Sequence, residues 1–164
     1  MLDSSVPGAG YGDIGDVDLA WLAAELATPA VRGTVVVVHH APIPAQGDLL
    51  QSLALQRPHA LLDVLVGGDV RVVLSGHYHL PIVQLIRGVP VVVAPGVANV
   101  ARSVADPEEE SATMAGGAVV VELDGEGMRA VPFTVPAVDH EVFRFDASRV
   151  REIAAVAGPP AVSL

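Results

Sequence analysis

The sequence contains no cysteine. Disulfide bonds and thiolate metal sites are therefore excluded, so a bound metal ion would need histidine, carboxylate or carbonyl ligands. The absence of cysteine also fits a reducing compartment, and we expect a cytoplasmic protein. Residues 1–13 have neither a basic start nor an apolar centre, so no signal peptide is predicted. No apolar run reaches the roughly 18 residues that span a bilayer, which argues against a membrane partner.

Basic residues are few. Lysine and arginine together number 9, against 19 aspartates and glutamates, which gives a formal net charge of -10. Such a chain repels the phosphate backbone of nucleic acids, so a nucleic-acid partner is not predicted. Part of the acidic charge is concentrated at 106–110, where "DPEEE" is typical of a solvated loop.

The chain is long enough for one domain with a substantial core. It has 164 residues, of which 51% are hydrophobic and 17% are charged. We expect a single domain over residues 1–157 and a flexible tail over 158–164.

The first half of the sequence has the pattern of an α/β fold. An amphipathic helix is predicted after Asp16, its expected N-cap. The β-branched run at 34–38 shows no alternation, which favours a strand covered on both faces. Pro58 and Gly67 flank a second predicted helix, and another buried strand follows at 69–75. A strand, a helix and a strand in this order predict a crossover unit with parallel strands.

The second half is rich in predicted strands. Arg87-Gly88 joins two short apolar runs into a hairpin or successive strands, and a polar loop is expected over 99–117. Asp146 is the expected N-cap of a terminal helix. The remaining β-rich segments are a hairpin over 117–135 that turns at 124–127, and a strand at 140–145.

Three of the six histidines stand where predicted strands end, namely His39, His77 and His79. Ligands of α/β sheets bind beyond the carboxyl ends of the strands, and strands joined by one helix are often neighbours. We therefore expect these imidazoles to lie close together and to bind metal. The alternative is a set of loop histidines that only form hydrogen bonds.

The sequence "GHYH" at 76–79 adds a geometric expectation. If its backbone is extended, His77 and His79 point to one side and Tyr78 to the other. Two imidazoles on one side could chelate one ion or bind two adjacent ions. Gly76 permits a turn that a side chain would obstruct. The His-x-His pair alone is a weak signal, and its position after a buried strand strengthens it.

The other histidines carry less information. His40 is expected to contact substrate, with orienting a ligand or facing solvent as open alternatives. His59 lies in a predicted helix and is expected to be a surface or packing residue. No function is predicted for His140.

At this point the residues show a family resemblance. "VVVVHHAPIP" at 35–44 and "LSGHYH" at 74–79 resemble the last two signature blocks of the calcineurin-like metallophosphoesterases. The segment 2–26 is similar to the matching part of their bacterial cyclic-nucleotide phosphodiesterase branch. The resemblance covers roughly residues 2–135.

The resemblance implies a fold, a reaction and a ligand set. The fold is a four-layer α/β/β/α sandwich with mixed sheets, which binds two divalent or trivalent ions of iron, manganese or zinc. A metal-bridged hydroxide attacks the phosphorus of a small phosphoester, here a cyclic nucleotide. By motif, His39 and His77 bind the second metal and His79 binds the first. No catalytic residue beyond the metal ligands is assigned.

The sequence departs from the family pattern. It has no Asp-x-His, its Asn99 is followed by Val100 where the family has histidine, and no Gly-Asp pair follows a buried strand. The resemblance therefore implies a partial metal site and the C-terminal half of a phosphoesterase domain. We expect the isolated chain to be inactive or incomplete, marginally folded, or a homodimer.

Two other functions stay open. One is a non-catalytic metal-binding or interaction protein on the same scaffold. The other is a cupin-like barrel, although Gln84 stands where that motif requires glutamate and Arg71 where it requires glycine.

Overall fold

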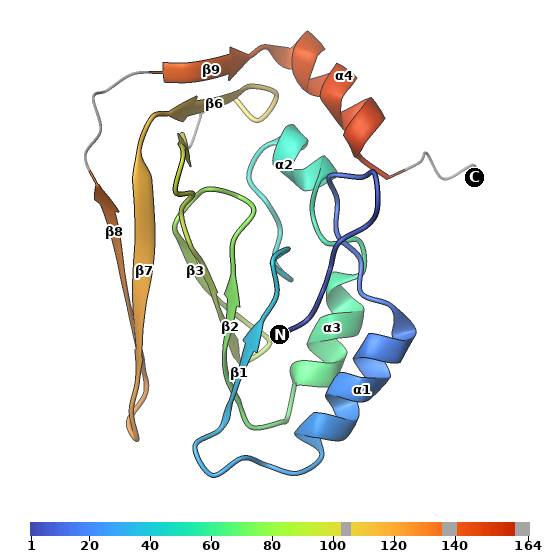
Figure 1. Cartoon of the computed structure of the whole chain (residues 1–164), viewed down its shortest axis with the longest axis vertical. Helices are drawn as coiled ribbons and strands as arrows, with labels where there is room; N and C mark the ends of the chain where they lie inside the picture. The colour runs from blue at the N-terminus through green and yellow to red at the C-terminus, as the bar shows by residue number, and fades with distance from the viewer. Residues whose placement is uncertain (103–105, 136–140, 160–164) are drawn as a thin grey trace.

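The computed structural model describes residues 1–102, 106–135 and 141–159. Its described strands form three sheets, and helices cover one face of the largest sheet (Figure 1). The helices are α1 (Asp16–Leu26), α2 (Asp48–Ser52), α3 (Pro58–Leu65) and α4 (Ala147–Ala157). The strands are β1 (Thr34–Val37), β2 (Val70–Ser75), β3 (Ile82–Ile86), β4 (Val89–Val93), β5 (Val100–Ala101), β6 (Glu110–Thr113), β7 (Gly116–Leu123), β8 (Met128–Val135) and β9 (Glu141–Phe145).

The central sheet has the strand order β1-β2-β4-β3. Strands β1, β2 and β4 are parallel, and β3 pairs antiparallel with β4. The crossover from β1 through α3 to β2 is as predicted, and so is the β3–β4 hairpin. The α/β class with a mixed sheet is therefore confirmed. The cupin-like alternative, which requires little helix, is wrong.

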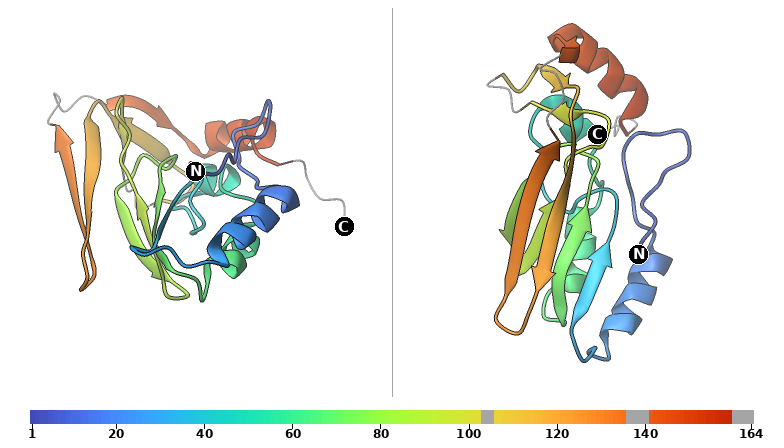
Figure 2. Two further views of the ribbon diagram at one scale, coloured as in Figure 1. Left: turned by 60° about the horizontal axis from the view of Figure 1, so that its bottom comes forward. Right: turned by 60° about the vertical axis from the view of Figure 1, so that its left-hand side comes forward.

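One face of this sheet packs against α1 and α3 (Figure 2). Helix α1 contributes the expected apolar stripe, in which Leu19, Leu22 and Leu26 are buried. Its N-cap is Gly15, one residue before the predicted Asp16. Pro58 opens α3, and the leucines of that helix are among the most buried residues of the core.

Strand β1 corrects the expectation of burial on both faces. Val36 and Val38 are 4% and 1% exposed, whereas Val35 and Val37 are 42% and 37% exposed. On the outward face, the β2 residue that pairs with Val35 is Val72, which is fully buried. The middle of that face is thus covered while the edge strand β1 is not. A run of valines satisfies both environments, so composition alone could not distinguish them.

The β7–β8 hairpin lies against this second face of the sheet (Figures 1 and 2). Its predicted turn is confirmed, because Asp124 Oδ1 accepts hydrogen bonds from the backbone N–H groups of Glu126 and Gly127, both at 2.8 Å. The turn is attached to β2 through Arg71, whose guanidinium donates to the carbonyls of Asp124 and Gly127 at 2.5 and 3.1 Å.

The third sheet, β5-β6-β9, occupies one end of the molecule together with α2 and α4. It corrects the polar loop expected over 99–117, since β5 and β6 lie within that range. The acidic run is not wholly solvated either, because Glu110 begins β6 and is 5% exposed. Strand β9 and the Asp146 cap of α4 are confirmed, whereas α2 was not predicted.

Two expectations concern the ends of the chain and the membrane. His140 and residues 160–164 of the expected tail lie outside the described residues. Among the helices that the structure describes, none combines the length and apolarity needed to cross a bilayer.

Candidate metal centre

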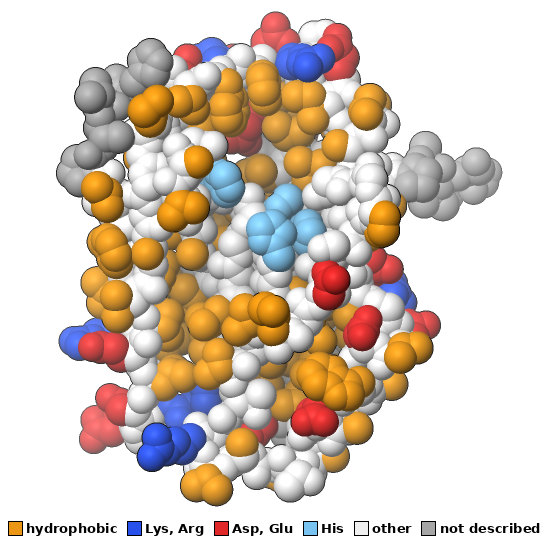
Figure 3. All heavy atoms as spheres, viewed as in Figure 1, with side chains coloured by type: hydrophobic (Ala, Val, Ile, Leu, Met, Phe, Trp, Pro, Cys, Tyr) orange, Lys and Arg blue, Asp and Glu red, His pale blue; other side chains and the backbone are white. Residues whose placement is uncertain are grey.

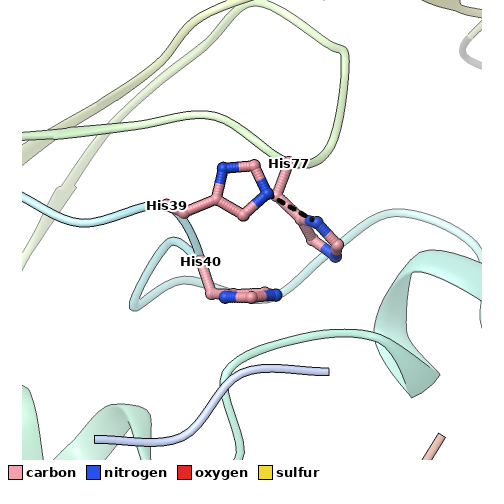
Figure 4. Close-up of side chains that lie close together, drawn as sticks. All are labelled: His39, His40 and His77. Carbon is pink, nitrogen blue, oxygen red and sulfur yellow. Dashed lines mark hydrogen bonds between the residues drawn. The ribbon is translucent and has the colours of Figure 1, made fainter. Parts of the chain in front are cut away.

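His39 and His77 meet at the carboxyl ends of two adjacent parallel strands. His39 follows β1 by two residues and His77 follows β2 by two residues, and β1 pairs directly with β2. Nε2 of His39 lies 3.2 Å from Nδ1 of His77, and the ring centroids are 5.0 Å apart (Figure 4). The prediction that these two imidazoles lie close together is therefore confirmed.

The protonation of His77 follows from its second nitrogen. Nε2 of His77 lies 2.9 Å from the carbonyl oxygen of Leu53, which can only accept a hydrogen bond. The proton of a neutral His77 therefore sits on Nε2, and the lone pair of Nδ1 faces His39. In one arrangement, His39 donates its own Nε2–H to this lone pair. In the other, Nε2 of His39 also carries a lone pair, and both nitrogens point at one cation.

The separation of the two nitrogens is compatible with a shared ion. Imidazole nitrogens bind zinc and similar ions at about 2.1 Å. Two such ligands at angles between tetrahedral and octahedral values are then about 3.0–3.4 Å apart. The observed 3.2 Å between His39 and His77 lies in this range. Little side-chain movement is needed to convert the pair from a hydrogen bond to a chelate.

The "GHYH" segment is not extended, which corrects the premise that His77 and His79 share one side. Both residues have left-handed backbones, with φ of 71° and 53°. Tyr78 is fully buried, and its ring centroid lies 5.7 Å from that of His77. Its hydroxyl donates to the carbonyl of Ile43 at 2.9 Å, which links the two histidine loops. Left-handed non-glycine residues cost roughly 1–3 kcal/mol each and persist where surrounding contacts enforce them.

His79 consequently stands apart from the His39–His77 pair. Its Nδ1 lies 2.8 Å from Oδ1 of Asn99, and its backbone carbonyl accepts a hydrogen bond from Ala101 at 3.1 Å. Burial lowers the pKa of His39, and repulsion from His79 contributes in the same direction. Histidine side chains gather near the middle of the face shown in Figure 3, beside a hollow in the surface.

His40 has internal partners on both ring nitrogens. Nδ1 lies 2.8 Å from the Ser4 hydroxyl and Nε2 lies 3.3 Å from the Gly10 carbonyl. The side chain is buried and packs so closely on Gly12 that a Cβ there would lie 2.3 Å from Nδ1. Although its nitrogens fall within the same cluster as those of His39 and His77, these bonds hold the N-terminal segment against β1. A substrate contact by His40 stays a prediction.

Burial keeps the cluster uncharged. Desolvation lowers the pKa values of His39 and His40, and it lowers that of His77 to about 4. Repulsion between the neighbouring imidazoles contributes in the same direction. Neutral imidazole is the form that binds metal, so the cluster is ready to act as a ligand set at neutral pH.

Among the described residues, the candidate metal ligands are histidine nitrogens, and no carboxylate belongs to the cluster. The one group of potential metal ligands found among them consists of His39, His40 and His77. Because His40 is already hydrogen bonded, this set suits one ion with several open positions and does not suit two ions. His59 is exposed on α3, as expected for a surface residue.

Several hydrogen-bond partners of the histidines could not be predicted from the sequence. The sequence does not indicate the Leu53 carbonyl as a partner, because every residue has a backbone oxygen. Ser4 lies in an irregular segment with no pattern. Asn99 was considered only as part of a Gly-Asn-His block, and its contact with His79 depends on the loop after β4.

Comparisons with known proteins indicate what the chain is similar to. No model of a known protein family matches the chain. A probable cyclic nucleotide phosphodiesterase of Rhodococcus erythropolis is 48% identical over 93 residues, which are 57% of this chain and 31% of that protein. A cAMP/cGMP dual specificity phosphodiesterase of Mycobacterium tuberculosis is 47% identical over 94 residues, 57% of this chain and 30% of its own length.

A 3′,5′-cyclic adenosine monophosphate phosphodiesterase of Pseudomonas aeruginosa is 36% identical over 80 residues, 48% of this chain and 29% of that protein. The chain thus spans about three tenths of the length of the curated relatives it matches. The predicted resemblance is confirmed, because about half of the chain is similar to cyclic nucleotide phosphodiesterases.

Proposed function

We propose that the chain supplies part of the active site of a metal-dependent phosphodiesterase, with His39, His77 and His79 as metal ligands. The substrate class is a small phosphoester, namely a cyclic nucleotide, as the names of the relatives suggest. The domain over residues 1–157 is then the C-terminal half of a four-layer sandwich. The remaining metal ligands come from outside the described residues or from a second copy of the chain.

The observation that carries this proposal is the convergence of His39 and His77. Two neutral nitrogens at 3.2 Å, with His77 held in one tautomer by Leu53, form half of a metal coordination sphere. Metal ions bound there would supply Lewis-acid polarisation of the phosphoryl oxygens and a lowered pKa for water. The residues of this chain orient the ions and keep their own nitrogens unprotonated.

Metal binding by the purified chain tests the ligand assignment. We expect Mn²⁺ or Zn²⁺ to bind, measured by calorimetry and by metal content, and we expect His39→Ala and His77→Ala to weaken binding at least tenfold. His59→Ala is the matched control, because it removes an exposed histidine from the same chain. Equal affinity in all four proteins would contradict the assignment.

Hydrolysis separates the two functions that remain. The cluster includes no carboxylate among the described residues, which favours a non-catalytic metal-binding protein as the second candidate. Metal-loaded chain is assayed with cyclic AMP and with bis(p-nitrophenyl) phosphate. Turnover that disappears in His77→Ala supports the phosphodiesterase, whereas tight binding without turnover supports the second candidate for the chain alone.

A further inference from the structure

We infer that Asn99 is a positioning residue that fixes the tautomer and the orientation of His79, so that His79 presents Nε2 to a ligand. The tautomer follows from the structure of this chain alone. The role of His79 as a metal ligand rests on the proposed function.

The contact between the two side chains determines the tautomer. Oδ1 of Asn99 lies 2.8 Å from Nδ1 of His79. An amide oxygen carries no hydrogen and can only accept, so Nδ1 must carry the proton of the neutral ring. The lone pair then sits on Nε2, at the far side of the ring from Asn99. A free neutral histidine prefers the opposite tautomer, with its proton on Nε2, so the hydrogen bond selects the less common form.

A close-fitting loop supports the ring in this position. Gly96 lies so near that a Cβ there would be 2.7 Å from Nδ1 of His79 and 2.3 Å from the carbonyl oxygen of Asn99. Only glycine allows the loop after β4 to approach the imidazole this closely. The Gly96 carbonyl in turn accepts a hydrogen bond at 3.0 Å from Gly117, the second residue of β7. The hairpin therefore buttresses the loop that carries Asn99.

The backbone of His79 is held as firmly as its ring. Its φ of 53° is unfavourable for a residue with a side chain, and the hydrogen bond from Ala101 to its carbonyl fixes that peptide. Ring and backbone together leave the imidazole little rotational freedom. A histidine with only a surface role, such as the exposed His59, needs none of these supports. Hydrogen bonds that orient a ligand ring typically improve metal affinity 10–100-fold.

The tautomer can be measured directly. Long-range ¹H–¹⁵N spectra of the metal-free chain at mildly alkaline pH separate protonated from bare ring nitrogens. We expect His79 of the unaltered chain to carry its proton on Nδ1. Asn99→Leu removes the acceptor at similar volume and should move the proton to Nε2, whereas Asn99→Asp keeps an acceptor and should retain the Nδ1–H form. A proton on Nε2 of His79 in the unaltered chain overturns the inference without any variant.

Two further readouts make the result independent of the proposed function. If Asn99→Leu does not fold, as judged by its backbone spectrum, Gly96→Ala should displace the His79 ring and shift its signals. An unchanged His79 tautomer in folded Asn99→Leu overturns the inference. If the unaltered chain binds Mn²⁺ or Zn²⁺, Asn99→Leu should bind 10–100-fold more weakly and Asn99→Asp should not. If no metal binds at all, the proposed function fails while the tautomer result still decides the role of Asn99.

Discussion

At the scale of single residues, neighbouring histidines have different hydrogen-bond partners. His39 directs a nitrogen at His77, whereas the next residue, His40, turns inward to Ser4 and Gly10. Local hydrogen bonds account for the difference, because Ser4 and Gly10 engage both ring nitrogens of His40 although its ring centroid lies only 4.3 Å from that of His77. A cluster defined by distance alone would treat the three rings as equivalent, and their hydrogen bonds show that they are not.

Replacing His40 should destabilise the fold. His40→Ala leaves the Ser4 hydroxyl and the Gly10 carbonyl without their ring partner and opens a cavity beside Gly12. We expect a loss of roughly 2–4 kcal/mol in the free energy of unfolding, measured by urea denaturation. The exposed His59→Ala should stay within about 0.5 kcal/mol of the original protein. A neutral His40→Ala would mean that the N-terminal segment is not held through this ring.

Glu110 should make stability depend on pH. Burial raises its pKa to about 7 from an ordinary value of 4.5. The folded chain therefore binds more protons than the unfolded chain between these values, so this residue lowers stability as pH rises from 4.5 to 7.

Glu110→Gln should remove that loss and be more stable than the original chain by roughly 1–3 kcal/mol above pH 7. The difference between the two proteins, followed by denaturation across this pH range, isolates Glu110, because the buried histidines contribute equally to both. A difference that does not vary with pH would contradict the raised pKa.

At the scale of elements, the periodic and capped segments were predictable and the context-dependent ones were not. Pro58 and Asp146 opened helices where expected, because capping is decided locally. The burial of β1 was not predictable, since the outward face depends on how far the β7–β8 hairpin reaches across the sheet. The left-handed turn at "GHYH" was hidden for the same reason, as tertiary contacts impose it on non-glycine residues.

The two faces of β1 should respond differently to truncation. Val36→Ala leaves a cavity between the sheet and the helices, and we expect it to cost roughly 2–3 kcal/mol. Val35→Ala lies on the half-open face, where the side chain is 42% exposed, and should cost less than about 1 kcal/mol. Denaturant midpoints of the two variants provide the comparison. Equal losses would indicate that something covers the outward face of β1.

Arg71 should control how firmly the β7–β8 hairpin is attached. Arg71→Met keeps the stem but removes the two donors that bind the carbonyls of Asp124 and Gly127. We expect faster amide hydrogen exchange in the hairpin and little change in β2 or β4, since the central sheet keeps its own ladder. Arg129→Met is the matched control, because that arginine pairs with Glu122 on the solvent side of the hairpin. Unchanged exchange in Arg71→Met would show that the hairpin is held by packing alone.

At the scale of the whole molecule, apolar surface remains exposed on both strands of the hairpin. Val120, Val131, Phe133 and Val135 are each 46–60% exposed. On β8 this exposure flanks Pro132, which cannot donate to an added strand and so protects that edge. Association would therefore use the face of the hairpin and not its edge.

We expect the isolated chain to self-associate through this face. Sedimentation measured over a wide concentration range should show a species larger than the monomer, and Val131→Thr with Phe133→Thr should shift it toward the monomer. Both residues lie on the exposed face of the hairpin, so the double variant should keep its fold. A monomer at every concentration would contradict this expectation and the homodimer predicted from the sequence.

The buried hydrogen bond from Tyr78 to Ile43 has a thermodynamic consequence for any ligand of the histidines. It joins the two loops that carry His39 and His77 before a ligand arrives, so ordering of these loops is completed during folding. An incoming ion then has little conformational entropy to remove. Its binding should leave the far-ultraviolet spectrum unchanged and show only a small change in heat capacity, in contrast to sites that fold around their metal.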